Sequence, residues 1–250
     1  MRTQTRTEML GLLLLSVVFH WPAVAQDGGS AVPSINSIIE SMEKAQSGRQ
    51  PHLSYQIIRE YRLFGKDSSN SDSRVIAEVN FRPPTSKDYE IQNASGSKRG
   101  EEVVRRLLDH EVEASSDKGQ GRTAITRENY EFTYVGEEAL DGQRCYLLEL
   151  KPKRKENDLI AGRAWVDKQS FFVRRIEGEV AKTPSWWLKR VRVNLVFADF
   201  EGTWLQTNME AVADVRIVGP HTLTSRIVDY RRSDVVASTQ MRMRSSNPSR

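Results

Sequence analysis

The feature that most constrains the fold is a predicted β-hairpin at Ala161 to Gly178, with the sequence AGRAWVDKQSFFVRRIEG. Side chains alternate along residues 161–166 and again along 171–176, and the residues between them, Asp167 to Ser170, favour a tight turn. Because successive residues of a strand point to opposite faces, a hairpin of this kind needs a cover for its apolar face. Strand patterns on both sides of it predict one large antiparallel sheet.

About ten strands are predicted in meander order from the alternation of apolar and polar residues between turn formers. They span residues 53–64, 74–81, 87–92, 130–134, 144–150, the two strands of the hairpin, 188–199, 203–218 and 222–231. An open sheet of that many strands usually curls, so we expect one concave face.

Two amphipathic helices interrupt the strand pattern. Ser34 predicts the N-cap of a helix that ends near Ser47, with Gly48 as its stop. The second helix spans 100–114, and its apolar side carries Val103, Val104, Leu107, Leu108 and Val112. Residues 115–121 predict a flexible connection after it.

The expected fold class is therefore α+β, mainly β: a curled antiparallel half-barrel sheet with an N-terminal helix and a helical lid over its concave face. Any amphipathic helix must bury its apolar stripe, so the pattern leaves open whether the 100–114 helix is a mobile lid or fixed core.

The N-terminus has the pattern of a secretory signal peptide. Arg2 and Arg6 precede an apolar run from Met9 to Phe19, and Ala23-Val24-Ala25 follows. The run is shorter than the ~20 residues that a membrane-spanning helix needs. We expect cleavage after Ala25 and a periplasmic protein, with an uncleaved anchor as the alternative.

The remaining chain predicts one folded domain, since no Pro/Gly/Ser-rich linker divides it. The expected organisation is a signal peptide at 1–25, a flexible leader at 26–32, the domain at 33–235 and a disordered tail at 236–250. The formal net charge is +4, and the two signs are interleaved along the strands, which argues against a nucleic-acid partner.

Patterns for catalysis are weak. Beyond the signal peptide, the histidines are His52, His110 and His221, with no pair at metal-ligand spacing. The single cysteine, Cys145, lies in a strand pattern that is typical of a small core residue. A glycosidase-like carboxylate pair is the enzymatic alternative. We expect a protein that is not an enzyme and that has no metal and no cofactor.

Several motifs resemble the periplasmic lipoprotein carriers LolA and LolB. They are Phe81-Arg82-Pro83, Ala164-Trp165-Val166-Asp167 and Val173-Arg174-Arg175-Ile176, which follow an N-terminal amphipathic helix and a long strand. The segment from Tyr130 to Pro152 is similar to the related regulatory sensor RseB/MucB. The chain departs from the carrier pattern at residues 95–114, where those proteins have a Trp/Tyr-rich strand.

The resemblance implies a half-barrel with a helical lid that encloses an apolar cavity for acyl chains, without catalysis. It also implies that the arginine at position 82 fastens the closed lid by hydrogen bonds to backbone groups of the helices. The residues that we expect to bind ligand are Arg82, Arg59, Tyr55, Ile57, Trp165, Leu107 and Leu108.

Two features have alternative interpretations. Arg59 interrupts the apolar face of its strand, where it could bind a lipid head group or extend its charge to an edge of the sheet. Trp186 and Trp187 could form an exposed anchor at a cavity rim or membrane surface, or be part of a hairpin core.

Two functions fit these patterns. The first is a periplasmic carrier, a monomer that binds a lipid or the acyl chain of a lipoprotein and makes transient membrane contact. The second is an RseB-like envelope sensor or regulatory domain, whose partner is an inner-membrane or envelope protein.

Overall fold

The computed structural model describes residues 33–48, 53–65 and 71–233, all within the unit Pro33–Arg250. The predicted signal peptide 1–25, leader 26–32 and tail 236–250 lie outside the described residues.

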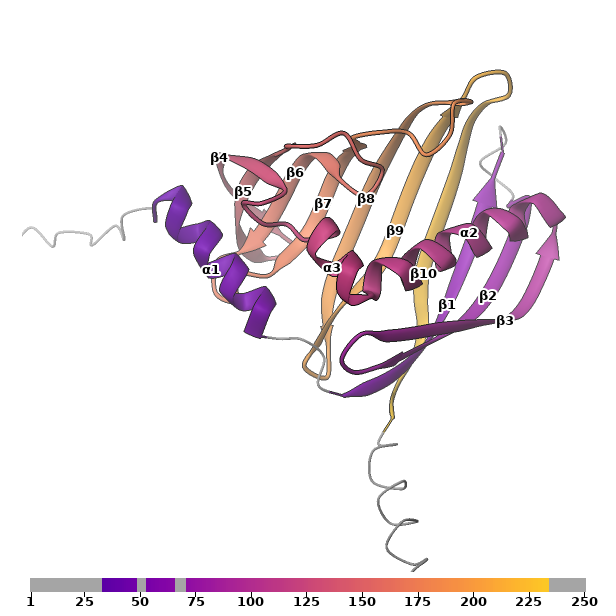
Figure 1. The fold of residues 1–250 in the computed structure, drawn as a ribbon, viewed down its shortest axis with the longest axis horizontal. Coiled ribbons are helices and arrows are strands. Elements are labelled where there is room, and N and C mark those ends of the chain that lie inside the picture. Colours follow the sequence, from indigo (N-terminus) through magenta and orange to yellow (C-terminus); the bar gives the residue numbers. More distant parts are fainter. Residues whose placement is uncertain (1–32, 49–52, 66–70, 234–250) are drawn as a thin grey trace, which may run out of the picture. The chain divides into compact units, whose positions relative to one another are not determined.

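Ten antiparallel strands form one open, curled sheet, as the sequence predicts (Figure 1). They are β1 (Ser54–Phe64), β2 (Ser73–Arg82), β3 (Ser86–Gly96), β4 (Tyr130–Leu140), β5 (Gln143–Pro152), β6 (Ile160–Asp167), β7 (Val173–Val180), β8 (Leu188–Phe200), β9 (Thr203–Val215) and β10 (Gly219–Ser233). The order across the sheet is β3-β2-β1-β10-β9-β8-β7-β6-β5-β4.

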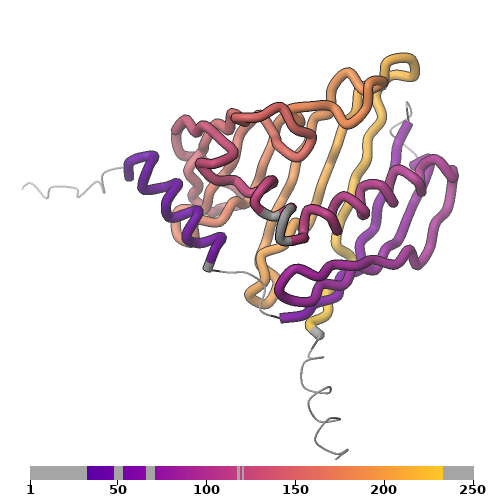
Figure 2. Tube along the Cα trace, viewed as in Figure 1, coloured from indigo at the N-terminus to yellow at the C-terminus, as the bar shows by residue number. Residues whose placement is uncertain are grey.

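The pairing of β1 with β10 makes β3 and β4 the two edges of this sheet, although they follow each other in sequence. The chain joins them through α2 (Lys98–Ser115) and α3 (Asp117–Thr123), which cross one face of the sheet (Figures 1 and 2). A connection between opposite edges has to pass over a face, and the apolar side of α2 is buried there.

The helix α3 corrects the prediction of a flexible connection at residues 115–121. The backbone N–H of Gly119 donates to the carbonyl oxygen of Ser116 at 2.9 Å and is 3.3 Å from its hydroxyl oxygen. This is the arrangement of a helix N-cap, so the serine-containing stretch begins a short helix.

The N-terminal helix α1 (Ile35–Gly48) forms as predicted, with the Ser34 hydroxyl accepting a hydrogen bond from the backbone of Ser37 at 3.2 Å. Its buried side belongs to a group of residues that we call the α1 cluster. The α1 cluster consists of Ile38, Met42, Tyr130, Tyr146, Leu148, Leu150, Leu159, Ala164, Val166, Val173 and Ile176.

The helix α2 buries its apolar side on the other half of the same face. Its N-cap is Ser97, whose hydroxyl accepts a hydrogen bond from the backbone of Gly100 at 3.1 Å. The buried residues on this side of α2 and on the strands below it are called the α2 cluster: Tyr55, Ile57, Tyr61, Val75, Ala77, Val79, Phe81, Val104, Leu108 and Leu205. Each helix therefore covers its own half of the sheet.

Candidate functional site

A cavity of about 440 Å³ lies between the covered halves of the sheet. This volume is within the usual range of small-molecule sites in proteins. The wall consists of Gln46, Tyr55, Ile57, Arg59, Lys87, Glu111, Ala114, Ser115, Ile125, Phe172, Val173, Phe197, Trp204, Leu205 and Gln206. These residues come from α1, α2, five strands and two connecting segments, so the cavity exists only in the folded sheet with its helices.

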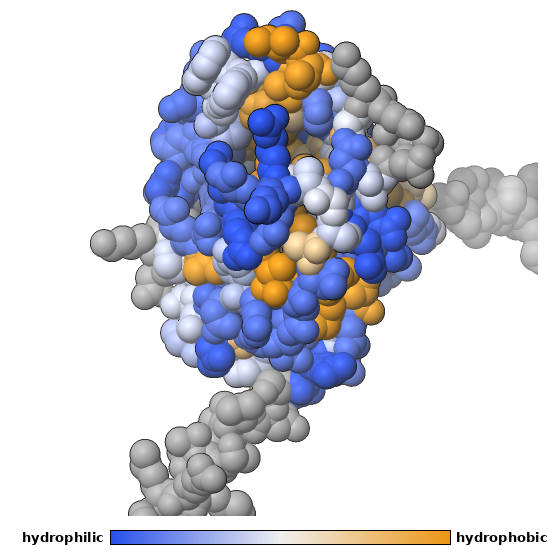
Figure 3. Space-filling model, turned by 90° about the vertical axis from the view of Figure 1, so that its right-hand side faces the viewer, coloured by the Kyte–Doolittle hydropathy of each residue, from blue (hydrophilic) through white to orange (hydrophobic). Residues whose placement is uncertain are grey.

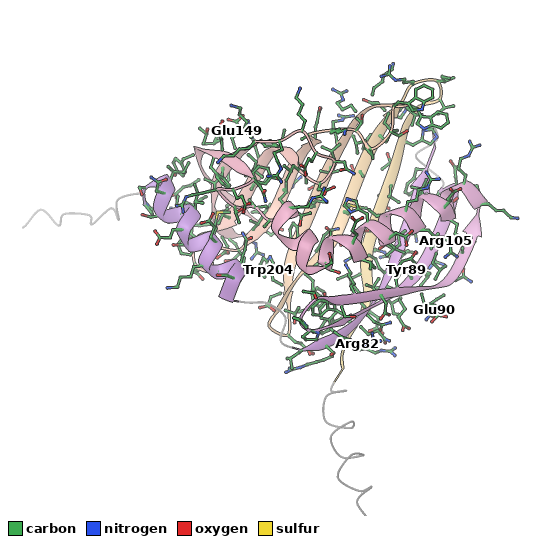
Figure 4. The ribbon with its side chains drawn as sticks, viewed as in Figure 1. Arg82, Tyr89, Glu90, Arg105, Glu149 and Trp204 are labelled. Carbon is green, nitrogen blue, oxygen red and sulfur yellow. The ribbon has the colours of Figure 1, made fainter. Side chains whose placement is uncertain are left out.

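Aromatic side chains form a large part of the wall. The ring of Trp204 stacks on Phe172 at a centroid distance of 5.0 Å, and its indole N–H donates to the carbonyl oxygen of Val173 at 2.9 Å. Figure 4 shows Trp204 in the region between α1 and α3. Because this hydrogen bond satisfies the only polar atom of the indole, the remaining ring surface is apolar.

Another part of the wall is charged. The carboxylate of Glu111, on α2, accepts a hydrogen bond from the Lys87 ammonium at 2.9 Å and lies 3.7 Å from Nη1 of Arg59. The Nη2 group of Arg59 donates to the carbonyl oxygen of Gln206 at 2.8 Å. Arg59, Lys87 and Glu111 are called the polar cluster below, and they connect α2 to the sheet.

The polar cluster holds Glu111 in its ionised form. Burial raises the pKa of Glu111, but the positive charges of Lys87 and Arg59 lower it by more, so the pKa lies below its usual value. Nearby, burial raises the pKa of Tyr55 to about 12 despite the opposing effect of Arg59, so its hydroxyl stays protonated.

Three of the predicted site residues, Tyr55, Ile57 and Arg59, line this cavity. The side chain of Arg59 is only 5% exposed, and its strand lies inside the sheet, between β2 and β10. The alternative in which its charge reaches an edge of the sheet is therefore wrong. Leu108 is buried in the α2 cluster and Leu107 packs against it, so these two support the helix next to the cavity.

Trp165 lies on the opposite face of the sheet from this cavity. It clusters with Cys145 and Leu147, its indole N–H donates to Glu138 at 2.7 Å, and the Arg175 guanidinium lies 5.3 Å from its ring centre. The period of two along a strand explains the placement, because the neighbours of Trp165 in sequence belong to the α1 cluster. The prediction of Cys145 as a core residue is confirmed.

Arg82 is also placed away from the cavity wall, at the end of β2 (Figure 4). Its Nη1 group donates to the carboxylate of Asp88 on the neighbouring strand at 2.6 Å, and both side chains are about half exposed. Within the described residues, the polar cluster rather than Arg82 provides the ionic contact between the sheet and α2.

Sequence reasoning missed Lys87, Glu111 and the three β9 residues of the wall. An arginine on an apolar strand face indicates a buried partner, and this signal was available at Arg59. The sequence did not identify the partner, because two strands and most of a helix separate Glu111 from Arg59 along the chain.

A second surface feature is an exposed apolar tip, formed by Trp186, Trp187, Ile217 and Val218. The two tryptophan rings stack at 5.2 Å and are 77% and 55% exposed, and Ile217 is 92% exposed. Arg216 ties the two loops together through hydrogen bonds to the carbonyl oxygens of Trp186 and Trp187. The alternative that this tryptophan pair belongs to a hairpin core is therefore wrong.

The β9–β10 turn, which carries part of the apolar tip, lies at the top of Figure 1. In Figure 3, which keeps the same vertical axis, hydrophobic side chains gather at the top of the face shown, while much of that face is hydrophilic. Exposed apolar patches of this kind mark contact surfaces for proteins or membranes.

Within residues 33–48, 53–65 and 71–233, no helix is long and apolar enough to cross a membrane. In the same part of the chain, no three His, Cys, Asp or Glu side chains are grouped so that they could hold a metal ion.

A family model described as an uncharacterized protein matches residues 121–228. No curated protein matches the sequence.

Several solved structures are similar at low sequence identity. A domain described as an outer membrane lipoprotein-sorting protein, from Vibrio parahaemolyticus, is 13% identical, with 83% of this chain and 97% of that chain covered and a TM-score of 0.42. A LolA superfamily protein from Nitrosomonas europaea is 15% identical, with 81% and 95% covered and a TM-score of 0.38. A chain of the MucA–MucB complex from Pseudomonas aeruginosa is 10% identical, with 81% and 96% covered and a TM-score of 0.25. The similar structures thus include both groups that the sequence resembles.

Proposed function

We propose that this protein is a non-catalytic periplasmic carrier that binds a lipid, or the acyl chain of a lipoprotein, in the cavity between the sheet and its helices. The observation that supports this function is the cavity itself, whose wall is largely aromatic and aliphatic. An acyl chain has no groups that need hydrogen-bond partners, so such a wall suits it.

Burial of the chain provides the binding energy. Each Å² of apolar surface removed from water contributes ~25 cal/mol, so ~150 Å² of buried chain supplies roughly 4 kcal/mol before the costs of association. The cavity volume of about 440 Å³ corresponds to roughly 15 water molecules, which is room for one chain rather than for a whole diacyl lipid.

The delipidated protein should take up a fluorescent fatty-acid probe at micromolar concentration and release it to competing phospholipid. The Ala114→Trp variant should weaken probe binding at least tenfold, because Ala114 lines the cavity and the indole fills part of it. Fluorescence titration measures both affinities.

The control is Val103→Trp, which adds the same bulk to an exposed position of α2. It should leave the probe affinity unchanged. A probe that stays dark in folded, delipidated wild type would show that the cavity is not a lipid site.

The second candidate function is a regulatory domain that binds an envelope protein. The apolar tip favours it, because exposed tryptophans are typical anchors of protein interfaces. In this case the double variant Trp186→Ser, Trp187→Ser should lose a specific co-purifying envelope protein and keep the probe affinity of wild type.

Val135→Ser is the matched control, since it replaces another exposed apolar residue on β4. Co-purification that is unchanged in the double variant would contradict a role of the apolar tip in partner binding. Loss of binding to anionic phospholipid vesicles, with no protein partner affected, would assign the tip to membrane contact.

A further inference from the structure

The polar cluster carries an uncompensated positive charge at the cavity wall. Among the described residues of the wall, Arg59 and Lys87 are cationic and Glu111 is anionic. One carboxylate oxygen of Glu111 is bound by Lys87 at 2.9 Å, whereas its other oxygen is 3.7 Å from Arg59, beyond hydrogen-bond distance. Arg59 is therefore only weakly neutralised.

Two buried donors on this strand also lack acceptors. The Nε atom of Arg59 and the hydroxyl of Tyr61 have no hydrogen-bond partner among the described residues. Tyr61 is fully buried two residues after Arg59, on the same face of β1. Burial raises the pKa of Tyr61 by more than the neighbouring Arg59 guanidinium lowers it, so its hydroxyl keeps its proton. Buried donors without an acceptor are unfavourable, and neither atom offers Arg59 a negative counter-charge.

We infer that the cavity binds a single-chain amphiphile with a monoanionic carboxylate head group. The head lies at Arg59 and Lys87, and the chain lies along the apolar wall around Trp204. This inference rests on the proposed function and specifies its ligand class.

The charge balance determines the preferred head group. A net charge in a buried site is energetically unfavourable. One negative charge on the ligand would bring the total charge of Arg59, Lys87 and Glu111 to zero. Arg59 is suited to a carboxylate because its guanidinium presents donors in a planar fork. A neutral head group would leave the net positive charge of the polar cluster unbalanced, so the acid should bind more tightly than an uncharged analogue.

Dodecanoate and dodecanol carry a carboxylate and a hydroxyl head group on the same C12 chain, so comparing them tests the head-group preference. In displacement of the fluorescent probe from the delipidated full chain, we expect dodecanoate to compete at a concentration at least tenfold lower than dodecanol. The Arg59→Met variant should abolish this preference, so that the two compounds compete at the same concentration. Arg82→Met, which removes an exposed arginine from a neighbouring strand, should keep the preference.

A variant at Lys87 keeps the test decisive if Arg59→Met does not fold. Lys87→Met should reduce the preference for dodecanoate over dodecanol several-fold. Glu111→Gln should increase the preference, because it removes the only anion from the described part of the cavity wall.

The outcomes separate the head-group inference from the proposed function. Equal competition by dodecanoate and dodecanol would overturn the inference and leave acyl-chain binding intact. Competition by acetate at the same concentration as dodecanoate would also overturn it, because a small anion would then suffice. Failure of both dodecyl compounds to compete would contradict the proposed function itself.

Discussion

Replacement of Leu108 by alanine is expected to lower the free energy of unfolding by about 2–4 kcal/mol. Leu108 is 1% exposed and packs in the α2 cluster, between α2 and the strands below it. Truncation there removes apolar contacts and leaves a cavity that the rigid sheet cannot fill. Denaturant unfolding of wild type and variant measures the difference.

Val103→Ala provides the control on the same helix. Val103 is 41% exposed, so its truncation should change the stability by no more than about 0.5 kcal/mol. The comparison also decides whether α2 is a mobile lid or fixed core. If Leu108→Ala cost less than about 1 kcal/mol but accelerated ligand exchange, α2 would open independently of the sheet and the fixed-core interpretation would be wrong.

Replacement of Glu60 by glutamine is expected to destabilise the protein by about 2 kcal/mol at pH 7. The Glu60 side chain is 1% exposed and accepts hydrogen bonds from Arg62 at 3.0 Å, Arg74 at 2.5 Å and Arg226 at 2.7 Å. These arginines belong to β1, β2 and β10, so one carboxylate ties together the three strands around Arg59.

The effect of Glu60 should depend on pH. Burial raises its pKa, but the hydrogen bonds from Arg74, Arg226 and Arg62 lower it by more, from 4.5 to about 2. A carboxyl group with a depressed pKa in the folded state stabilises the protein above its unfolded pKa and loses this contribution as pH falls. The shift corresponds to at most roughly 3 kcal/mol, and the partial exposure of the three arginines reduces it to about 2 kcal/mol.

The difference in stability between wild type and Glu60→Gln should therefore shrink between about pH 4.5 and pH 2, and denaturant unfolding across this range measures it. Glu131→Gln is the control, because Glu131 forms an exposed pair with Lys151 and should have little effect at any pH. A difference that stays constant down to pH 2 would show that the carboxylate charge does not stabilise the sheet.

The sequence alone determined the elements whose signals are local. The alternation of side chains identified all ten strands, and Ser34 with its following apolar periodicity identified α1. The same local reasoning found the apolar side of α2 and three residues of the cavity wall. The edge strands β3 and β4 extend beyond their predicted ends because their last residues, which lack a regular alternation of apolar and polar side chains, continue the backbone pairing with β2 and β5.

The tertiary structure decided which of these residues share a site. Both faces of the central hairpin carry large apolar side chains. The alternation along the strand therefore places Trp165 and its sequence neighbours on opposite faces, but it does not show which face is concave. The pairing of β1 with β10 and of β10 with β9 brings Arg59 within hydrogen-bond distance of Gln206, and the crossing of α2 brings Glu111 close to Arg59. Residues so far apart in sequence meet only when the whole sheet has formed, because strand periodicity specifies the direction of a side chain and not the strand that pairs beside it.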